Sequence, residues 1–313
     1  MAVQTARRGA VAGSRRNSPA APAPALAAGY TALTFGDEFD SLATVNTGTT
    51  TRVGFKWSNW IPFEGKVMPG SCFTQGSWTD SRGVSSPSVL TIIQNRWNWN
   101  QALYSVDGRN GAGFAQRYGY FEARFCHPAQ QVVRGVTNPS SPSKSGYPDA
   151  PSSPLGWPAW WSLAKSHLTF TELTVAGAKD YLELDFHEYY DSAAQSPIYG
   201  KRLTGTVHDW HGGNDWRNTD GNQYGAHMDD PAAWHVYGCL WKPGRFTWYL
   251  DGVAQHSIAY SAGAAPSPNN VTAGYVLPPK TFQVADLDTQ GVALALGTGN
   301  GYPMHVDWVR VWR

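Results

Sequence analysis

The chain is poor in charge and in long apolar runs. Only 15% of its 313 residues are Asp, Glu, Lys or Arg, and 24 basic against 23 acidic residues leave a formal net charge of +1. A chain so evenly balanced has no basic stripe of the kind that binds nucleic acid and no charged block that suits a membrane surface. No apolar run reaches 18 residues, so the sequence predicts no membrane-spanning helix.

Cysteine is also scarce, with only Cys72, Cys126 and Cys239. An odd number leaves at least one thiol outside any intramolecular disulfide, and one disulfide plus a free thiol stays open because spacing does not give the pairing. Cys126 and Cys239 lie in strand-like segments and are expected to be small buried apolar side chains. The sequence has no Cys/His spacing typical of a zinc site.

Helical periodicity is equally scarce, and short alternating segments take its place. Residues 120–125 (YFEARF) and 246–250 (FTWYL) alternate in the way that half-buried strands do. Clusters of Gly, Pro, Asn and Ser separate such segments, and the 33 Gly and 21 Pro are typical of a loop-rich β-sandwich. We therefore predict an all-β chain with a single domain over residues 30–313.

The first 29 residues differ in composition from the rest of the chain. They are rich in Ala, Pro and Arg, and they lack the continuous apolar stretch of a standard signal peptide. A segment of this composition buries too little apolar surface to fold. Residues 1–29 are therefore predicted to be disordered and dispensable for stability.

Three carboxylates stand close together in the segment 181–190, YLELDFHEYY. The residues around them are strand formers, so we predict a β-strand. Side chains at positions i and i+2 share a face, which places Glu183 and Asp185 together. Glu188 would face the other way on a regular strand, but one extra residue in a β-bulge would return it to the same face.

The spacing of the outer two carboxylates suits hydrolysis of a glycosidic bond. With the bulge, Glu183 and Glu188 are effectively four residues apart, and side chains that lean inward leave their carboxyls roughly 5 Å apart. Retaining glycosidases have this separation. Asp185 lies between them, and its charge would raise the pKa of a neighbouring Glu and keep the acid protonated. The alternative is a solvated strand edge with three acids, which is disfavoured because like charges on one face repel.

The carboxylate segment resembles the Glu-x-Asp-x-x-Glu motif of family 16 glycoside hydrolases, in the branch that carries a bulge. Seven other segments resemble the family in the same order: FGDEFD (35–40), YGYFEAR (118–124), GWPAWW (156–161), GTVH (205–208), WHVYGCLW (234–241), FTWYLDG (246–252) and VDWVRVW (306–312). The resemblance covers residues 35–313. It implies a β-jelly-roll sandwich of two curved antiparallel sheets with a sugar-binding cleft on the concave face.

The resemblance also implies roles for individual residues. Glu183 matches the nucleophile, Asp185 the assisting acid and Glu188 the general acid/base. His208 matches a histidine on the neighbouring strand that faces the carboxylates, either as a catalytic support or as a structural residue. His187 departs from the family, where many members carry an aliphatic residue or Met, and we expect it to face the other side of the sheet.

Aromatic residues are plentiful, with 15 Trp and 15 Tyr. Their flat apolar faces suit the C–H faces of pyranose rings. Trp157, Trp160 and Trp161 fall where the resemblance places a cleft tryptophan, and Trp210 lies in a polar stretch, so these four are the expected substrate-binding residues. Trp160 and Trp161 are consecutive on a strand and face opposite ways, so one of them belongs in the core.

The resemblance implies an endo-acting retaining glycosidase whose partner is a β-linked polysaccharide. A β-1,3-type glucan is the first choice of substrate, and the even charge balance favours a largely neutral polymer. A β-linked galactan of the agar or carrageenan type is the alternative. A carbohydrate-binding jelly roll that has lost catalysis is a further one, because a fold does not fix a function. Hydrolysis and transglycosylation both remain open.

No cofactor is expected for catalysis, but the resemblance implies a structural Ca²⁺ on the convex face. The aspartate before the closing aromatic strand would be a ligand there, and Asp307 holds that position; oxygen ligands suit such a cation. We expect a monomer. The substrate class favours a secreted or periplasmic location, although no clear signal peptide is present.

Overall fold

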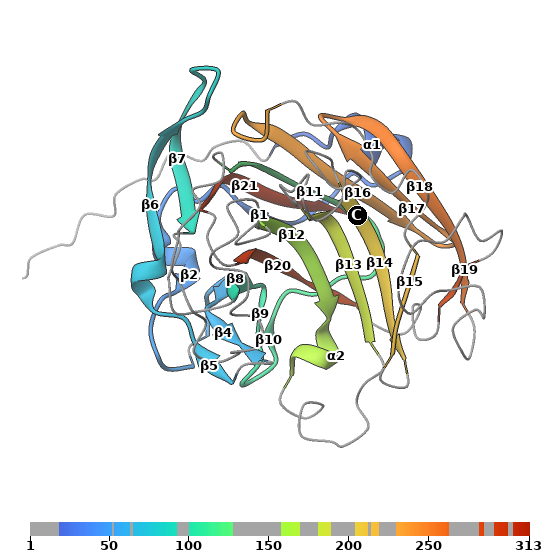
Figure 1. Cartoon of the computed structure of the whole chain (residues 1–313), viewed down its shortest axis with the longest axis horizontal. Coiled ribbons are helices and arrows are strands. Elements are labelled where there is room, and N and C mark those ends of the chain that lie inside the picture. Colours follow the sequence, from blue (N-terminus) through green and yellow to red (C-terminus); the bar gives the residue numbers. More distant parts are fainter. Residues whose placement is uncertain are drawn as a thin grey trace, which may run out of the picture.

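Two curved sheets lie face to face and enclose the core, as the computed structural model shows (Figure 1). The structure describes residues 19–51, 53–62, 65–92, 100–127, 158–169, 181–188, 204–211, 214–218, 230–262, 282–284, 291–299 and 303–313. Nearly all strand pairs in these ranges are antiparallel, with β2–β3 and β18–β19 parallel. The prediction of an all-β jelly-roll sandwich is confirmed.

The first sheet contains nine strands among the described residues. In order across the sheet they are β19 (Phe282–Val284), β18 (Val253–Ala262), β17 (Arg245–Leu250), β16 (His235–Lys242), β11 (Gly119–Cys126), β21 (Met304–Trp312), β7 (Ser85–Ile92) and β6 (Phe73–Thr79), while β1 (Leu33–Asp37) also pairs with β21. The last strand of the chain therefore lies at the centre of this sheet, next to strands from its first half.

The second sheet has eight strands in the described part of the chain. Their order is β15 (Asn214–Asn218), β14 (Thr204–His211), β13 (Tyr181–Glu188), β12 (Pro158–Ala164), β20 (Val292–Gly299), β8 (Asn100–Tyr104), β3 (Trp57–Ser58) and β2 (Val45–Asn46). The strand with the three carboxylates is β13. It lies inside the sheet, between β12 and β14, so its register is fixed on both sides.

Short elements complete the described fold. They are the strand pairs β4 (Trp60–Ile61) with β5 (Lys66–Val67) and β9 (Val106–Asp107) with β10 (Ala112–Gly113), the helices α1 (Ala23–Ala27) and α2 (Lys165–Leu168), and the 3-10 turns Leu42–Thr44 and Gly70–Cys72. No helix in the described ranges has the length and apolar character needed to cross a membrane.

Large aromatic and aliphatic side chains from both sheets fill the space between them. Trp160, Trp241 and Trp248 are fully or almost fully buried, and each supplies a large apolar area to the core. The three cysteines, Cys72, Cys126 and Cys239, are buried as well, and all three are free thiols, so no disulfide forms among them. Burial raises the pKa of the Cys126 thiol to about 12.

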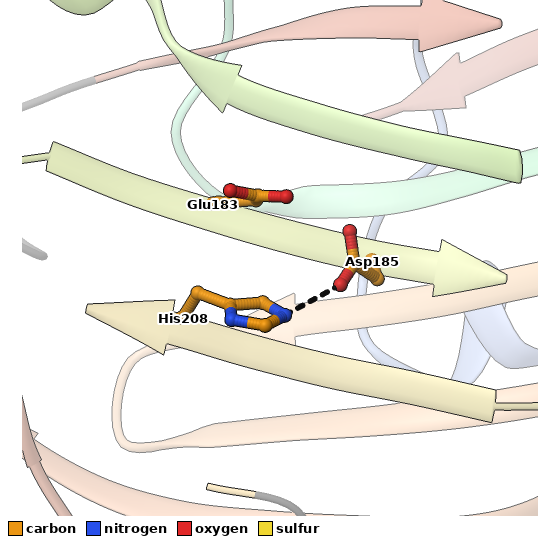
Figure 2. A group of neighbouring side chains, drawn as sticks. All are labelled: Glu183, Asp185 and His208. Carbon is orange, nitrogen blue, oxygen red and sulfur yellow. Dashed lines mark hydrogen bonds and ion pairs between the residues drawn. The ribbon is translucent and has the colours of Figure 1, made fainter. Parts of the chain in front are cut away.

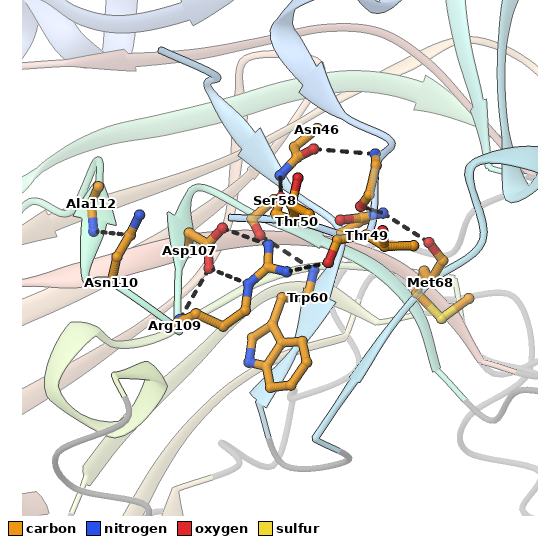
Figure 3. A network of polar contacts seen from close by, with 12 residues as sticks. Asn46, Thr49, Thr50, Ser58, Trp60, Met68, Asp107, Arg109, Asn110 and Ala112 are labelled. Carbon is orange, nitrogen blue, oxygen red and sulfur yellow. Dashed lines mark hydrogen bonds and ion pairs between the residues drawn. The ribbon is translucent and has the colours of Figure 1, made fainter. Parts of the chain in front are cut away.

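A salt-bridge network ties the irregular elements at the β2–β3 edge of the second sheet (Figure 3). The Arg109 guanidinium donates to both carboxylate oxygens of Asp107, at 2.9 and 2.7 Å, and to the backbone oxygen of Thr49 at 3.1 Å. The same guanidinium lies 5.2 Å from the ring centre of Trp60. Two parallel hydrogen bonds and a ring face hold the arginine in one geometry, and its contacts connect three segments of the chain.

The N-terminal segment departs from the prediction for residues 1–29. Residues 23–27 form α1, which packs on the outer face of the first sheet, and Ala25 is fully buried against Tyr120, Leu240 and Trp312. The prediction is wrong for this part of the segment. Small Ala and Pro side chains pack closely against large aromatic rings, so the segment docks without long apolar side chains of its own. Residues 1–18 lie outside the described ranges.

We predict that deleting residues 1–28 lowers the melting temperature by several degrees. The deletion uncovers the apolar side chains beneath α1, and removing a few tens of Å² of apolar contact from each costs about 1–3 kcal/mol in total. Deleting residues 1–18 is the matched control because it leaves α1 in place. Thermal unfolding followed by circular dichroism measures both variants, and equal melting temperatures would show that α1 contributes nothing to stability.

Candidate active site

The predicted β-bulge is present in β13. On the β14 side, Asp185 lies opposite Thr206 and Glu188 lies opposite Thr204, so three steps along β13 match two steps along its neighbour. On the β12 side the register shifts at the same place. One extra residue is therefore inserted between Asp185 and Glu188, and the prediction made from the spacing of the carboxylates is confirmed.

The bulge places two consecutive side chains in the core. Phe186 stacks on Phe121 of the opposite sheet with ring centres 5.1 Å apart, and His187 lies 4.2 Å from the ring centre of Tyr237 in that same sheet. Because Phe186 and His187 both point inward, Glu188 returns to the face that carries Glu183. The expectation that His187 faces away from the carboxylates is also confirmed.

His187 behaves as an aromatic filler of the core. It is fully buried, and burial holds the pKa of its imidazole well below the usual value; the neighbouring His127 and His235 act in the same direction. Burial likewise lowers the pKa of His127 to about 3. Both rings are therefore neutral near pH 7 and occupy the space beneath the bulge without introducing charge.

The carboxylates of β13 meet a histidine and a tryptophan from β14. His208 lies directly opposite Glu183 in the ladder and donates from Nε2 to Oδ2 of Asp185 over 2.8 Å (Figure 2). The indole N–H of Trp210 donates to Oε2 of Glu183 over 2.7 Å. One oxygen of the predicted nucleophile is thus held by a neutral donor.

Asp185, the middle acid of the three, is the most deeply buried. The side chain of Asp185 is 2% exposed and that of His208 is 12% exposed, whereas Glu183 and Glu188 are half-buried. A buried carboxylate needs a partner because an unpaired charge away from water is costly, and His208 supplies that partner. Asp185 is therefore fixed in place, while the two glutamates remain accessible.

The group could also hold a cation. One ligand atom each from Glu183, Asp185 and His208 lie within 4.8 Å of one another. The hydrogen bonds from His208 and Trp210 already hold one oxygen of each of the two carboxylates. Nothing in its geometry requires an ion to hold the three side chains together.

The four predicted sugar-binding tryptophans fall in different places. Trp160 is fully buried in the core, and Trp161 is partly exposed on the carboxylate face, where it lies opposite Asp185. The expectation that one of this pair belongs in the core is confirmed. Trp210 is half-buried beside Glu183, and Trp157 lies outside the described residues.

Both carboxylate oxygens of Asp307, the predicted calcium ligand, are bonded to other side chains of the protein. One carboxylate oxygen pairs with the guanidinium of Arg124, and the other accepts a hydrogen bond from the hydroxyl of Ser86. A cation at this carboxylate would lie beside a permanent positive charge, so these residues do not fit a calcium site. The calcium itself remains a prediction, and catalysis is described below without it.

A row of aromatic rings next to Glu183 was not predicted. Tyr181 stacks on Trp210 with ring centres 5.5 Å apart, and on its other side His167 of α2 lies 3.5 Å away. Tyr181 is two residues before Glu183 and shares its face, so the alternation of β13 already contained this information. The contact with His167 depends on how the chain returns after β12, which the sequence does not show.

Solved structures are similar to this chain in fold, although no protein-family model and no curated protein matches its sequence. β-Agarase A from Zobellia galactanivorans is 15% identical, with 90% of this chain and 92% of that chain covered and a TM-score of 0.45. The laminarinase catalytic domain from Thermotoga maritima is 13% identical, with 91% and 98% covered and a TM-score of 0.43. A family 16 endo-glucanase from Bacteroides ovatus is 12% identical, with 88% and 99% covered and a TM-score of 0.45. At this level the likeness concerns the fold alone.

We predict that Trp210→Phe lowers kcat by about 10- to 100-fold and leaves KM within about threefold. The substitution keeps an aromatic ring beside Tyr181 but removes the hydrogen bond to Glu183, and a bond to a charged group contributes about 1.5–3 kcal/mol. Trp78→Phe, at a partly buried tryptophan of the other sheet, is the control. A kcat within twofold of wild type would show that the bond to Glu183 has no part in turnover.

Proposed function

We propose that this protein is an endo-acting retaining glycoside hydrolase that cleaves a β-linked polysaccharide, with a β-1,3-type glucan as the favoured substrate. The observation that carries the proposal is the bulge in β13, which returns Glu188 to the face of Glu183 and Asp185. Three acids gathered on one face of a chain with so few charges need a function, because their mutual repulsion opposes folding.

In the first step, Glu188 acts as the acid and Glu183 as the nucleophile. Glu183 attacks the anomeric carbon through a carboxylate oxygen, the bond from that carbon to the glycosidic oxygen breaks, and Glu188 gives its proton to the departing oxygen. The product is a covalent glycosyl ester of Glu183. The indole of Trp210 fixes the direction of attack, since it holds Oε2 of that carboxylate.

In the second step, the ionised Glu188 takes a proton from water. The hydroxide so formed attacks the anomeric carbon on the face that the leaving group vacated, and the ester bond to Glu183 breaks. Two inversions give a product with the β-configuration of the substrate. Asp185, which His208 holds in place, lies between the two glutamates on β13 and is the assisting acid of this proposal.

The surroundings of the acids suit a sugar polymer. Trp161, Trp210 and Tyr181 place partly exposed aromatic side chains on the same face, and such rings bind pyranoses by their apolar C–H faces. A location outside the cytoplasm is part of the same proposal, because the enzyme meets a polymer of this kind only after the enzyme has been exported. A monomeric state is part of the proposal as well.

The choice between substrates can be tested with four polymers. Laminarin, mixed-linkage β-glucan, agarose and carrageenan are incubated with the protein, and the products are sized over time. Early release of mixed oligosaccharides from laminarin supports the proposal, whereas cleavage of agarose or carrageenan alone would replace the glucan with a galactan. Binding of any polymer without cleavage would favour a carbohydrate-binding protein.

We predict that Glu183→Gln lowers kcat by at least about 10³-fold and leaves folding and oligosaccharide binding nearly unchanged, because the amide cannot form the ester intermediate. Glu122→Gln is the matched control. Glu122 lies in the first sheet, where it accepts a hydrogen bond from Trp312, and burial raises its pKa to about 7. Retention of more than a tenth of the wild-type rate by Glu183→Gln would show that another group is the nucleophile.

We predict that Glu188→Ala separates substrates by their leaving groups. The kcat/KM for the natural polymer should fall severely, whereas that for a 2,4-dinitrophenyl glycoside should fall far less, because this leaving group departs without a proton. Steady-state kinetics on both substrates measures the difference. A loss of the same size on both would argue against Glu188 as the acid.

A further inference from the structure

One hydrogen bond joins the two sheets directly at the bulge. The indole N–H of Trp248, in β17 of the first sheet, donates to the backbone oxygen of Asp185, in β13 of the second, over 2.8 Å. Trp248 is fully buried, so no water competes for either group. The bonded oxygen belongs to the residue directly before the extra position of the bulge.

This carbonyl differs from those of a regular strand. In a regular strand the carbonyl lies in the plane of the sheet and bonds to a neighbouring strand, whereas a bulge disrupts the ladder locally. The carbonyl of Asp185 accepts from a side chain of the opposite sheet, so it is turned out of the plane and into the core. Without Trp248 it would be a buried acceptor with a lost partner, which costs about 1–3 kcal/mol.

A glycine provides the space through which the indole reaches the carbonyl. Gly205 in β14 lies between Thr204 and Thr206, the two residues opposite the ends of the bulge. A Cβ atom on Gly205 would lie 2.0 Å from Nε1 of Trp248 and 2.2 Å from its Cδ1. Any side chain at this position would therefore push the indole away from Asp185.

The indole is held from its other side as well. Its ring stacks on His256 of β18 with ring centres 4.4 Å apart and planes only 8° from parallel. The stack fixes the plane of the ring, and within that plane the N–H points at the bulge. A preset donor of this kind favours the backbone geometry that offers it an acceptor.

We propose that Trp248 and Gly205 are positioning residues that hold the β13 bulge in the geometry that aims Glu188 at the leaving group. The inference rests on the proposed function, because it assigns these residues to the same acid. Neither residue touches the reacting atoms: Trp248 acts through the backbone of Asp185, and Gly205 acts by leaving room for Trp248. Loss of the bond should therefore impair proton donation by Glu188 more than attack by Glu183.

The test compares Trp248→Phe with Trp241→Phe. Trp241 is an equally buried tryptophan of the first sheet whose N–H donates to the Tyr260 hydroxyl, away from the bulge. Laminarin, or the polymer that wild type cleaves, and the 2,4-dinitrophenyl glycoside of its disaccharide are the two substrates. We expect the ratio of polymer to aryl kcat/KM to fall at least about tenfold in Trp248→Phe and to stay within about twofold in Trp241→Phe. The polymer loss should lie in kcat, with KM nearly unchanged.

A second replacement removes only the hydrogen bond. Benzothienylalanine at position 248 keeps the two-ring shape but has sulfur in place of the N–H, so it remains informative if Trp248→Phe fails to fold. It should lower the same ratio and move the basic limb of the pH–rate profile, which reports the acid. Normal ratios and an unmoved basic limb would overturn the inference.

A substitution at Gly205 provides an independent test of the same inference. Gly205→Ala should lower the ratio as Trp248→Phe does, and the double variant should be no worse than either single one, because both remove the same contact. Additive losses would overturn the inference. If wild type cleaves no polymer, or if Glu183→Gln stays active, the proposed function fails. If wild type cleaves a polymer and Glu183→Gln is inactive, but the ratio is unchanged in the Trp248 and Gly205 variants, the positioning role alone fails.

Discussion

A single extra residue in β13 determines which face of the sheet each carboxylate occupies. Strand side chains alternate strictly, so if residues 181–188 formed a regular strand without a bulge, Glu188 would point into the core beside Phe186, and a buried unpaired carboxylate there would be severely destabilising. With it, Phe186 and His187 both point inward and the three acids share one face. The shared face of the three acids and the packing of the core therefore depend on the same backbone irregularity.

The two sheets cooperate to maintain that irregularity. Tyr237 and Phe121 of the first sheet receive the two consecutive inward side chains, and Trp248 bonds the carbonyl that the bulge turns out of the ladder. On the other face, His208 and Trp210 bond Asp185 and Glu183. The geometry of the acids is thus set from the core side by packing and from the exposed side by hydrogen bonds, and preorganisation of this kind suits the two-step displacement that we propose.

Local features of the sequence predicted the strand, the bulge and the shared face, because alternation and spacing within β13 carry that information. The same alternation predicted that one of Trp160 and Trp161 lies in the core, but not which of the two. The bonds made by Trp210 and Trp248 could not be predicted, since each depends on how separate strands come into register or how two sheets face each other. The docking of α1 was missed for a related reason: its small side chains have no apolar periodicity, and their fit depends on the aromatic surface beneath them.

The most direct test of the shared face is the configuration of the azide products from two variants. Glu183→Ala and Glu188→Ala are each given a 2,4-dinitrophenyl β-glycoside and sodium azide, and proton NMR reads the anomeric configuration of the glycosyl azide. Azide replaces the missing carboxylate, so we predict an α-azide from Glu183→Ala, where it attacks the substrate from the nucleophile's side, and a β-azide from Glu188→Ala, where it attacks the ester from the other side. The same anomer from both variants, or the two anomers exchanged, would contradict the placement of Glu183 and Glu188 on opposite sides of one sugar.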